Sequence, residues 1–204
     1  PNCITSIEEA MKNADVIISA STPGPDTIKQ EWVKSMNQKA IVFACANPVP
    51  EIYPYAAKEA GAYIVATGRG DFPNQVNNSI GFPGILKGAL IVRASKITDN
   101  MAIAAAHSLA NYAEKRGINP ENIVPKMDEP DVFPVEAADV AMQAIKDGVA
   151  RKTVTWNEAF QLAKKDIDYS RSMTKLLCDK GFVTDPPSAM LEEALEFTIK
   201  QIEG

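Results

Sequence analysis

The sequence predicts an α/β fold in which an incomplete, doubly wound parallel sheet is followed by C-terminal helices. Three short apolar runs read as strands, Asp15–Ala20, Ala40–Ala46 and Ala62–Ala66, and a helical pattern separates each from the next. Strands that are apolar along their whole length are typical of parallel sheets, because helices cover both of their faces. We therefore expect all three strands to be buried on both faces.

The loops between these elements are unequal in length and composition. The loops that enter strands are short, namely Asn37–Lys39 and Gly61 alone. The loops that leave strands are long and rich in Gly, Pro and Asn, namely Ser21–Pro25, Asn47–Pro50 and Thr67–Asn78. Ligands of open α/β sheets bind at the carboxyl edge, where the leaving loops gather. We expect these three loops to converge on one site.

Local signals define the helices of the sheet region. Ser6 and Glu9 form a capping box that starts a short helix ending near Asn13. A second helix is expected over Ile28–Met36. A third is expected over Tyr53–Ala60, with a glycine at the usual C-terminal capping position.

The remaining chain is predicted to be helical, with breaks at glycines and prolines. Thr155 and Glu158 form a second capping box, and the helix that they start carries an apolar stripe from Trp156 to Leu177. We divide the chain into a sheet domain, residues 1–150, and a helical extension, residues 151–204. The expected helices are Ile80–Ala94, Thr98–Arg116, Val135–Lys146, the Thr155 helix up to Gly181, and a last helix from Pro186-Pro187 to about Ile202.

Composition excludes several classes of protein. With 21 basic and 26 acidic residues the net charge is −5, and the charges are interspersed, so no basic patch predicts nucleic-acid binding. No apolar run approaches the roughly 20 residues of a membrane span, and no signal-peptide pattern is present. Cys3, Cys45 and Cys178 lack the spacing of a disulfide framework or a zinc site. We expect a cytoplasmic protein.

Neutral amides dominate the predicted site. Asn47 follows the second strand, and Asn77 and Asn78 stand together before a helix. An amide both donates and accepts hydrogen bonds, which suits ribose hydroxyls, a carboxamide or a substrate carboxylate, but not proton abstraction. The alternative is that Asn77 or Asn78 only caps the helix. His107 lies in an Ala-rich helical segment and reads as a core or surface residue without a catalytic role.

Several separated motifs together resemble one family. Ala46–Ile52 (ANPVPEI), Ala66–Arg69 (ATGR), Asp71–Asn78 (DFPNQVNN) and Gly81–Gly84 (GFPG) resemble the cofactor domain of malic enzymes of the short prokaryotic type. The similarity runs over about residues 6–148. Gly70 stands where many relatives carry Ser, and the segment after residue 151 resembles an extension found in only some members.

The resemblance implies a Rossmann-like fold and a function. The activity would be oxidative decarboxylation of malate to pyruvate and CO2, with NAD or NADP and a divalent metal, Mg²⁺ or Mn²⁺. It implies that Ser21 and Thr22 lie along the cofactor, that Asn47 lies by both cofactor and substrate, and that Asn77 and Asn78 lie by the substrate.

The resemblance also implies that this chain holds only part of the active site. The family's Tyr and Lys for acid–base chemistry, its acidic metal ligands and its Gly-rich phosphate turn belong to a preceding half. We therefore predict no catalytic or metal-ligating residue here, and expect the C-terminal portion of a homo-oligomeric enzyme, inactive alone. Three alternatives stay open: a cofactor-binding regulatory module, another nicotinamide dehydrogenase such as an amino-acid or folate enzyme, and an oligomerisation module that uses the Trp156–Leu177 stripe.

Overall fold

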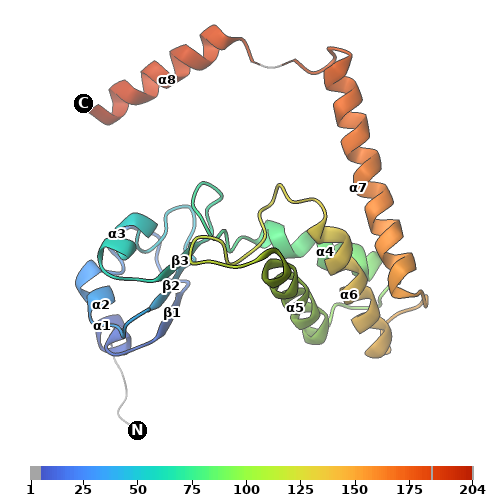
Figure 1. Ribbon diagram of the computed structural model, residues 1–204, viewed down its shortest axis with the longest axis horizontal. Coiled ribbons are helices and arrows are strands. Elements are labelled where there is room, and N and C mark those ends of the chain that lie inside the picture. The colour runs from blue at the N-terminus through green and yellow to red at the C-terminus, as the bar shows by residue number, and fades with distance from the viewer. Residues whose placement is uncertain (1–5, 185, 204) are drawn as a thin grey trace. The chain divides into compact units, whose positions relative to one another are not determined.

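The computed structural model describes residues 6–184 and 186–203 of the chain. The chain forms two compact units, residues 1–164 and 165–204, and the division falls inside a helix. The first unit contains a sheet with three small helices and a bundle of longer helices (Figure 1). The domain boundary expected near residue 150 stays a prediction.

The sheet is parallel and open, as predicted. Its order is β1-β2-β3, and the register places Ser19, Ala44 and Thr67 side by side at the ends of the three strands. All three strands therefore end at the same level, and the loops that follow them leave from one edge. The strands are β1 (Val16–Ser19), β2 (Ile41–Ala44) and β3 (Ile64–Thr67).

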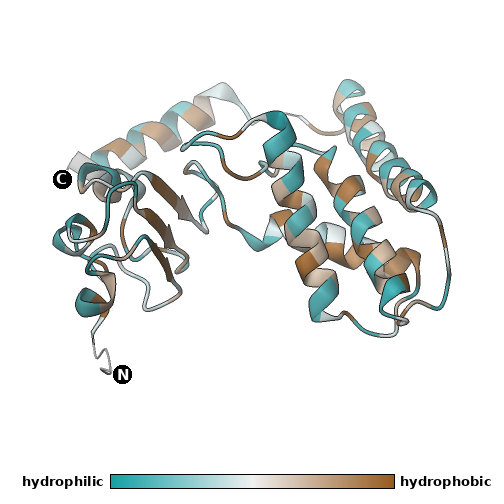
Figure 2. Ribbon diagram, turned by 60° about the horizontal axis from the view of Figure 1, so that its bottom comes forward, coloured by the Kyte–Doolittle hydropathy of each residue, from teal (hydrophilic) through white to brown (hydrophobic). Residues whose placement is uncertain are grey.

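Three short helices pack with the sheet in one core. They are α1 (Ile7–Met11), α2 (Gln30–Lys34) and α3 (Pro54–Glu59). The cluster joins Met11, Val33 and Ala57, one from each helix, to Val42 and Val65 of the strands. The strands are among the most hydrophobic segments of the chain (Figure 2). Burial of these apolar side chains is the main favourable contribution to the fold.

Two of the predicted helix signals in this region are confirmed and one is corrected. The Ser6 side chain accepts a hydrogen bond from the Glu9 backbone N–H, which caps α1. Gly61 follows α3 with φ of 103°, a left-handed conformation that favours glycine. However, α2 is shorter than the predicted Ile28–Met36, because Lys29 is extended and the Ile28 N–H bonds the Glu51 carbonyl instead of continuing a helix.

Strand β1 does not match the prediction of burial on both faces. Val16 is 49% and Ile18 is 71% exposed, whereas Val42 and Val65 of the neighbouring strands are buried. A side chain of an open sheet is buried only where another layer covers its face. Among the described residues no layer covers Ile18.

The longer helices form a second core. They are α4 (Asn78–Ile91), α5 (Asp99–Arg116) and α6 (Val132–Lys146). Helices α4 and α6 pack closely at Gly84 and Gly88, since a Cβ atom at Gly88 would lie 2.5 Å from the Ala137 carbonyl oxygen of α6. Helix α6 begins three residues before the predicted Val135, with Pro134 in its first turn, where a missing N–H is tolerated.

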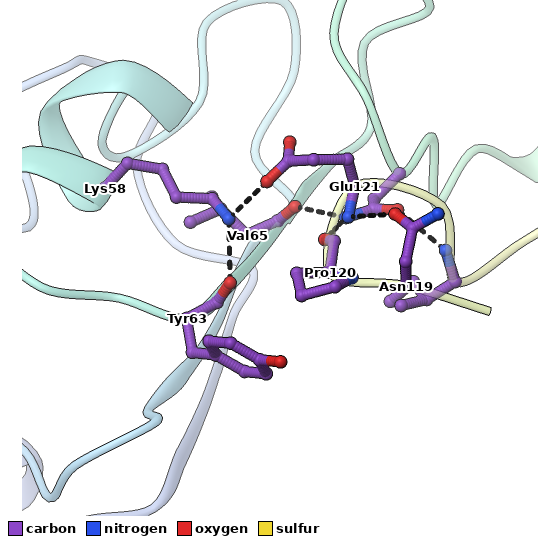
Figure 3. Close-up of polar contacts among 8 residues, drawn as sticks. Lys58, Tyr63, Val65, Asn119, Pro120 and Glu121 are labelled. Carbon is purple, nitrogen blue, oxygen red and sulfur yellow. Dashed lines mark hydrogen bonds and ion pairs between the residues drawn. The ribbon is translucent and has the colours of Figure 1, made fainter.

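The loop between α5 and α6 is tied to the sheet. The Lys58 ammonium donates to the Tyr63 carbonyl and pairs with Glu121, while the Asn119 side chain accepts from the Glu121 N–H at 2.9 Å (Figure 3). Buried Asn74 donates to the carbonyl oxygens of Val65 and Pro120, at 3.0 and 2.8 Å. These contacts join the loop after β3 to the helical part of the unit.

Helices α7 (Trp156–Asp179) and α8 (Ser188–Glu203) complete the chain. The Thr155–Glu158 capping box is confirmed, because each residue accepts a backbone N–H from the other. Only the start of the predicted stripe joins a core: Phe160 packs against the second core, and Ala163 is buried. In the second unit, residues 165–184 and 186–200 are all exposed except half-buried Ile167. The described helices include none with the length and apolarity of a membrane span.

Candidate functional site

The loops that leave β1 and β2 are joined by one buried side chain, Glu51. Its Oε1 accepts hydrogen bonds from the Ser19 hydroxyl at 2.7 Å and from the Ser21 backbone N–H at 2.8 Å. Its Oε2 accepts a hydrogen bond from the backbone N–H of Ala46 at 3.0 Å. Ala46 directly precedes Asn47. The carboxylate therefore bonds the exit of β1 with one oxygen and the exit of β2 with the other.

Hydrogen bonds keep the Glu51 carboxylate charged. Burial raises its pKa, but the N–H groups of Ser21 and Ala46 and the Ser19 hydroxyl favour the ionised form, and the net pKa is lowered. Neighbouring Cys45 shows the opposite shift, since burial and the negative charge of Glu51 raise the pKa of its thiol. Cys45 and Cys178 are free thiols, as expected, and Cys3 lies outside the described residues.

The exits of β2 and β3 meet at Gly68. A Cβ atom at Gly68 would lie 3.0 Å from Asn47 Nδ2 and 3.2 Å from Asn47 Oδ1, so the Asn47 amide lies over the bare α-carbon of the glycine. The Asn77 side chain donates to the Gly68 carbonyl oxygen at 2.6 Å. Asn47 and Asn77 therefore both contact this one glycine, and the three exits lie at a single edge.

The two adjacent asparagines differ in their hydrogen bonding. Asn77 is the N-cap of α4, and its Oδ1 accepts from the Ser79 N–H and hydroxyl at 3.0 and 2.7 Å. Its amide is thus occupied at both ends. Asn78 is exposed, and its side chain forms no hydrogen bond with the described part of the chain. The capping alternative applies to Asn77 and leaves Asn78 available to a ligand.

Arg69 and Asp71, at the same edge, neutralise each other. The guanidinium donates two hydrogen bonds to the carboxylate, at 2.8 and 2.6 Å, and stacks over the Phe72 ring. A third contact reaches the Pro48 carbonyl at 3.4 Å. The hydrogen bond from Arg69 lowers the pKa of Asp71. The pair therefore braces the loops after β2 and β3.

A cavity of about 350 Å³ opens beside the start of α4. Asn77 and Asn78 lie on its polar side, and Phe82, Leu109 and Val124 supply apolar walls. A small apolar pocket with a few polar groups at one end is the usual form of a small-molecule site.

The groups at this edge fit the implied cofactor. Asn47 and Thr22 are exposed and offer an amide and a hydroxyl, which suit ribose hydroxyls or a carboxamide. Gly68 leaves the space in which the Asn47 amide lies. Among the described residues no group of three or more His, Cys, Asp or Glu side chains could hold a metal ion.

Sequence reasoning assigned no role to Glu51 or Ser19, although Glu51 lies within a recognised motif. The available signal was an acidic residue placed between Pro50 and Ile52 in an otherwise apolar strand exit. Such a carboxylate is buried only when donors surround it. Without coordinates those donors could not be identified, because Ser19 is 32 residues away in the sequence.

Comparison with known families gives a match over most of the first unit. The family model described as "Malic enzyme, NAD binding domain" matches residues 4–146. A solved structure, the malic enzyme of Entamoeba histolytica, aligns with a TM-score of 0.98 and 65% identity over 100% of this chain and 42% of its own.

Curated relatives agree with this match. The chain is 43% identical over 160 residues to the bifunctional malic/malolactic enzyme of Bacillus subtilis, which covers 78% of the chain and 38% of that protein. It is 42% identical over 164 residues to the NADP-dependent malic enzyme of Rhizobium meliloti, covering 73% and 21%. The chain thus spans less than half the length of each of these proteins.

Proposed function

Because the chain belongs to the malic enzyme family, we propose that it is the C-terminal portion of an oxidoreductase that converts malate to pyruvate and CO2. The observation that carries the proposal is the arrangement at Gly68. Asn47 lies over this glycine and Asn77 bonds its carbonyl, so the amides expected at the cofactor and at the substrate lie at one edge. Membership of the family also removes the amino-acid and folate dehydrogenase alternatives.

In this proposal the residues of the chain bind and orient the cofactor and the substrate. Thr22 and Ser21 lie along the cofactor, Asn47 lies between nicotinamide ribose and substrate, and Asn78 donates to the substrate carboxylate. Asn77 fixes the start of α4 and its contact with Gly68. When bound, NAD or NADP supplies the hydride acceptor. A divalent metal, Mg²⁺ or Mn²⁺, and the acid–base residues belong to the preceding part of the enzyme.

The exposed side chains and the unpaired outer edge of β1 support the idea that the preceding part of the enzyme packs against this strand. Val16 and Ile18 present apolar side chains on a strand whose outer edge has no partner among the described residues. Native proteins rarely leave such an edge open. We therefore expect the purified 204-residue chain to form no NADH or NADPH from malate, measured by absorbance with Mn²⁺ present. Turnover by this chain, free of any second chain, would contradict the proposal.

Asn78→Ala is expected to weaken substrate binding selectively. In a complete enzyme that carries this chain, the KM for malate should rise at least tenfold, since one hydrogen bond to a charged group is lost, worth about 1.5 kcal/mol or more. The KM for the cofactor should change little. Steady-state kinetics checks this, with exposed Asn111→Ala on α5 as the matched control. An equal loss for both ligands would contradict the assignment of Asn78.

The proposal includes a cytoplasmic homo-oligomer. Free cysteines agree with a reducing compartment, and the second unit exposes many large apolar side chains, Leu176, Phe182 and Phe197 among them. Sedimentation of the chain with and without residues 165–204 tests the oligomer. Truncation at 164 is preferable to truncation at 150, because Ala159 belongs to the second core of the first unit and Ala163 is also buried.

A further inference from the structure

We propose that Glu51 is a positioning residue whose carboxylate sets the spacing between the loops after β1 and β2, so that Thr22 and Asn47 reach the same cofactor. This inference rests on the proposed function. It concerns a residue that touches neither substrate nor cofactor and acts through the backbone of the two loops.

The two carboxylate oxygens bond different loops, and this supports the role. Oε1 takes the donors of the β1 exit, Ser19 and Ser21, and Oε2 takes the Ala46 N–H of the β2 exit. An ionised carboxylate accepts at both oxygens, whereas the amide of Gln accepts at one and donates at the other. Only the carboxylate can hold both loops.

The free-energy cost of burying Glu51 argues against a role in packing alone. The residue is 0% exposed, and within the described chain its partners are peptide N–H groups and hydroxyls rather than a lysine or an arginine. Burying a charge without a counter-ion is costly, and an apolar side chain could fill the same space. An apolar residue, however, would leave the N–H groups of Ser21 and Ala46 without an acceptor.

Glu51 is itself fixed to the core. Its carbonyl oxygen accepts from the Ile28 N–H at 2.9 Å, and both Ile28 and Ile52 are almost completely buried. The carboxylate therefore projects from a rigid point. The two N–H groups that it holds, those of Ser21 and Ala46, stand one residue before Thr22 and Asn47 respectively. A shift at either N–H would move a predicted cofactor contact.

Glu51→Gln tests the role in the chain itself. Amide hydrogen exchange at Ser21 or Ala46 should become at least tenfold faster, while exchange at Val42 in the centre of β2 should not change. Glu136→Gln is the matched control, since Glu136 is also completely buried but bonds neither loop. It should leave exchange at Ser21 and Ala46 as in the wild type. Unchanged exchange at both amides in Glu51→Gln would overturn the inference.

A complete enzyme gives the second readout. Glu51→Gln should raise the KM for the cofactor, NAD or NADP, about tenfold and the KM for malate by a clearly smaller factor, because both Thr22 and Asn47 face the cofactor, whereas malate keeps Asn78 next to the Asn77–Gly68 contact, which does not involve Glu51. A parallel rise in both would indicate general structural loss and overturn the inference. If the wild-type enzyme fails to oxidise malate, the proposed function is wrong, while the exchange result still tests whether Glu51 holds the two loops.

Ser19→Ala covers the case in which Glu51→Gln does not fold. It removes one donor to Oε1 and leaves the Ala46 bond in place. Exchange at Ser21 should rise severalfold more than exchange at Ala46. If exchange at Ser21 and Ala46 rose by the same factor relative to the wild type, and Glu51→Gln did not fold, Glu51 would have a role in the fold alone, and the inference would be overturned.

Discussion

Glu136→Gln is expected to abolish most of the decline in folding stability between about pH 5 and pH 8. Glu136 lies on α6 and is completely buried, and neither carboxyl oxygen has a hydrogen-bond partner in the described structure. Burial alone raises the pKa of its carboxyl to about 8. The side chain is therefore a neutral acid at pH 7, packed against Gly84 of α4.

The sign of the effect follows from proton binding. Below the ordinary pKa of 4.5, both folded and unfolded chains hold the Glu136 proton. Between pH 4.5 and about 8 the folded chain keeps it and the unfolded chain releases it, so the free energy of unfolding falls as pH rises. The full shift corresponds to about 4–5 kcal/mol as an upper limit.

Urea unfolding at pH 5.5, 6.5 and 7.5 measures this decline. The wild type should lose stability at each step, and Glu136→Gln, which cannot titrate, should show a much smaller change. Exposed Glu59→Gln on α3 is the control and should follow the wild type. A wild-type stability that stays level or increases over this range would show that Glu136 is ionised in the folded protein.

Gly88→Ala is expected to reduce the free energy of unfolding by about 2–3 kcal/mol. The new Cβ atom would lie 2.5 Å from the Ala137 carbonyl oxygen and 2.8 Å from Val140 Cβ. Because the first of these is backbone, relief requires α4 and α6 to separate. Alanine is the better helix former by about 1 kcal/mol, so a net loss would show that packing outweighs propensity.

Gly70→Ala is the matched control for this substitution. Its nearest neighbour outside the adjacent residues, Gln75 Oε1, would lie 4.0 Å from the new Cβ atom, and its backbone is not left-handed. Its effect should stay within about 0.5 kcal/mol. Thermal or urea unfolding measures both variants. If Gly88→Ala proved as stable as the wild type, the helix contact would be looser than the structure indicates.

The fold was predictable wherever a signal is local. The capping boxes at Ser6 and Thr155 and the glycine after α3 depend on residues within a few positions of one another. The extent of α2 was not predictable, because Ile28 gives its N–H to Glu51, a residue distant in the sequence. The exposure of Ile18 was missed for a related reason, since apolar composition shows that a strand can be buried but not what covers it.

The family, the parallel strands and the asparagines that mark the edge could be recognised from the sequence alone. This recognition was possible because hydrophobic periodicity, turn residues and the order of motifs are features of the sequence itself. The three-dimensional arrangement was needed to show which asparagine caps a helix, which one stays free, and that Glu51 joins two loops. Those assignments depend on donors and acceptors that are far apart in the sequence, and a buried polar group is stable only where folding brings its partners within hydrogen-bonding distance.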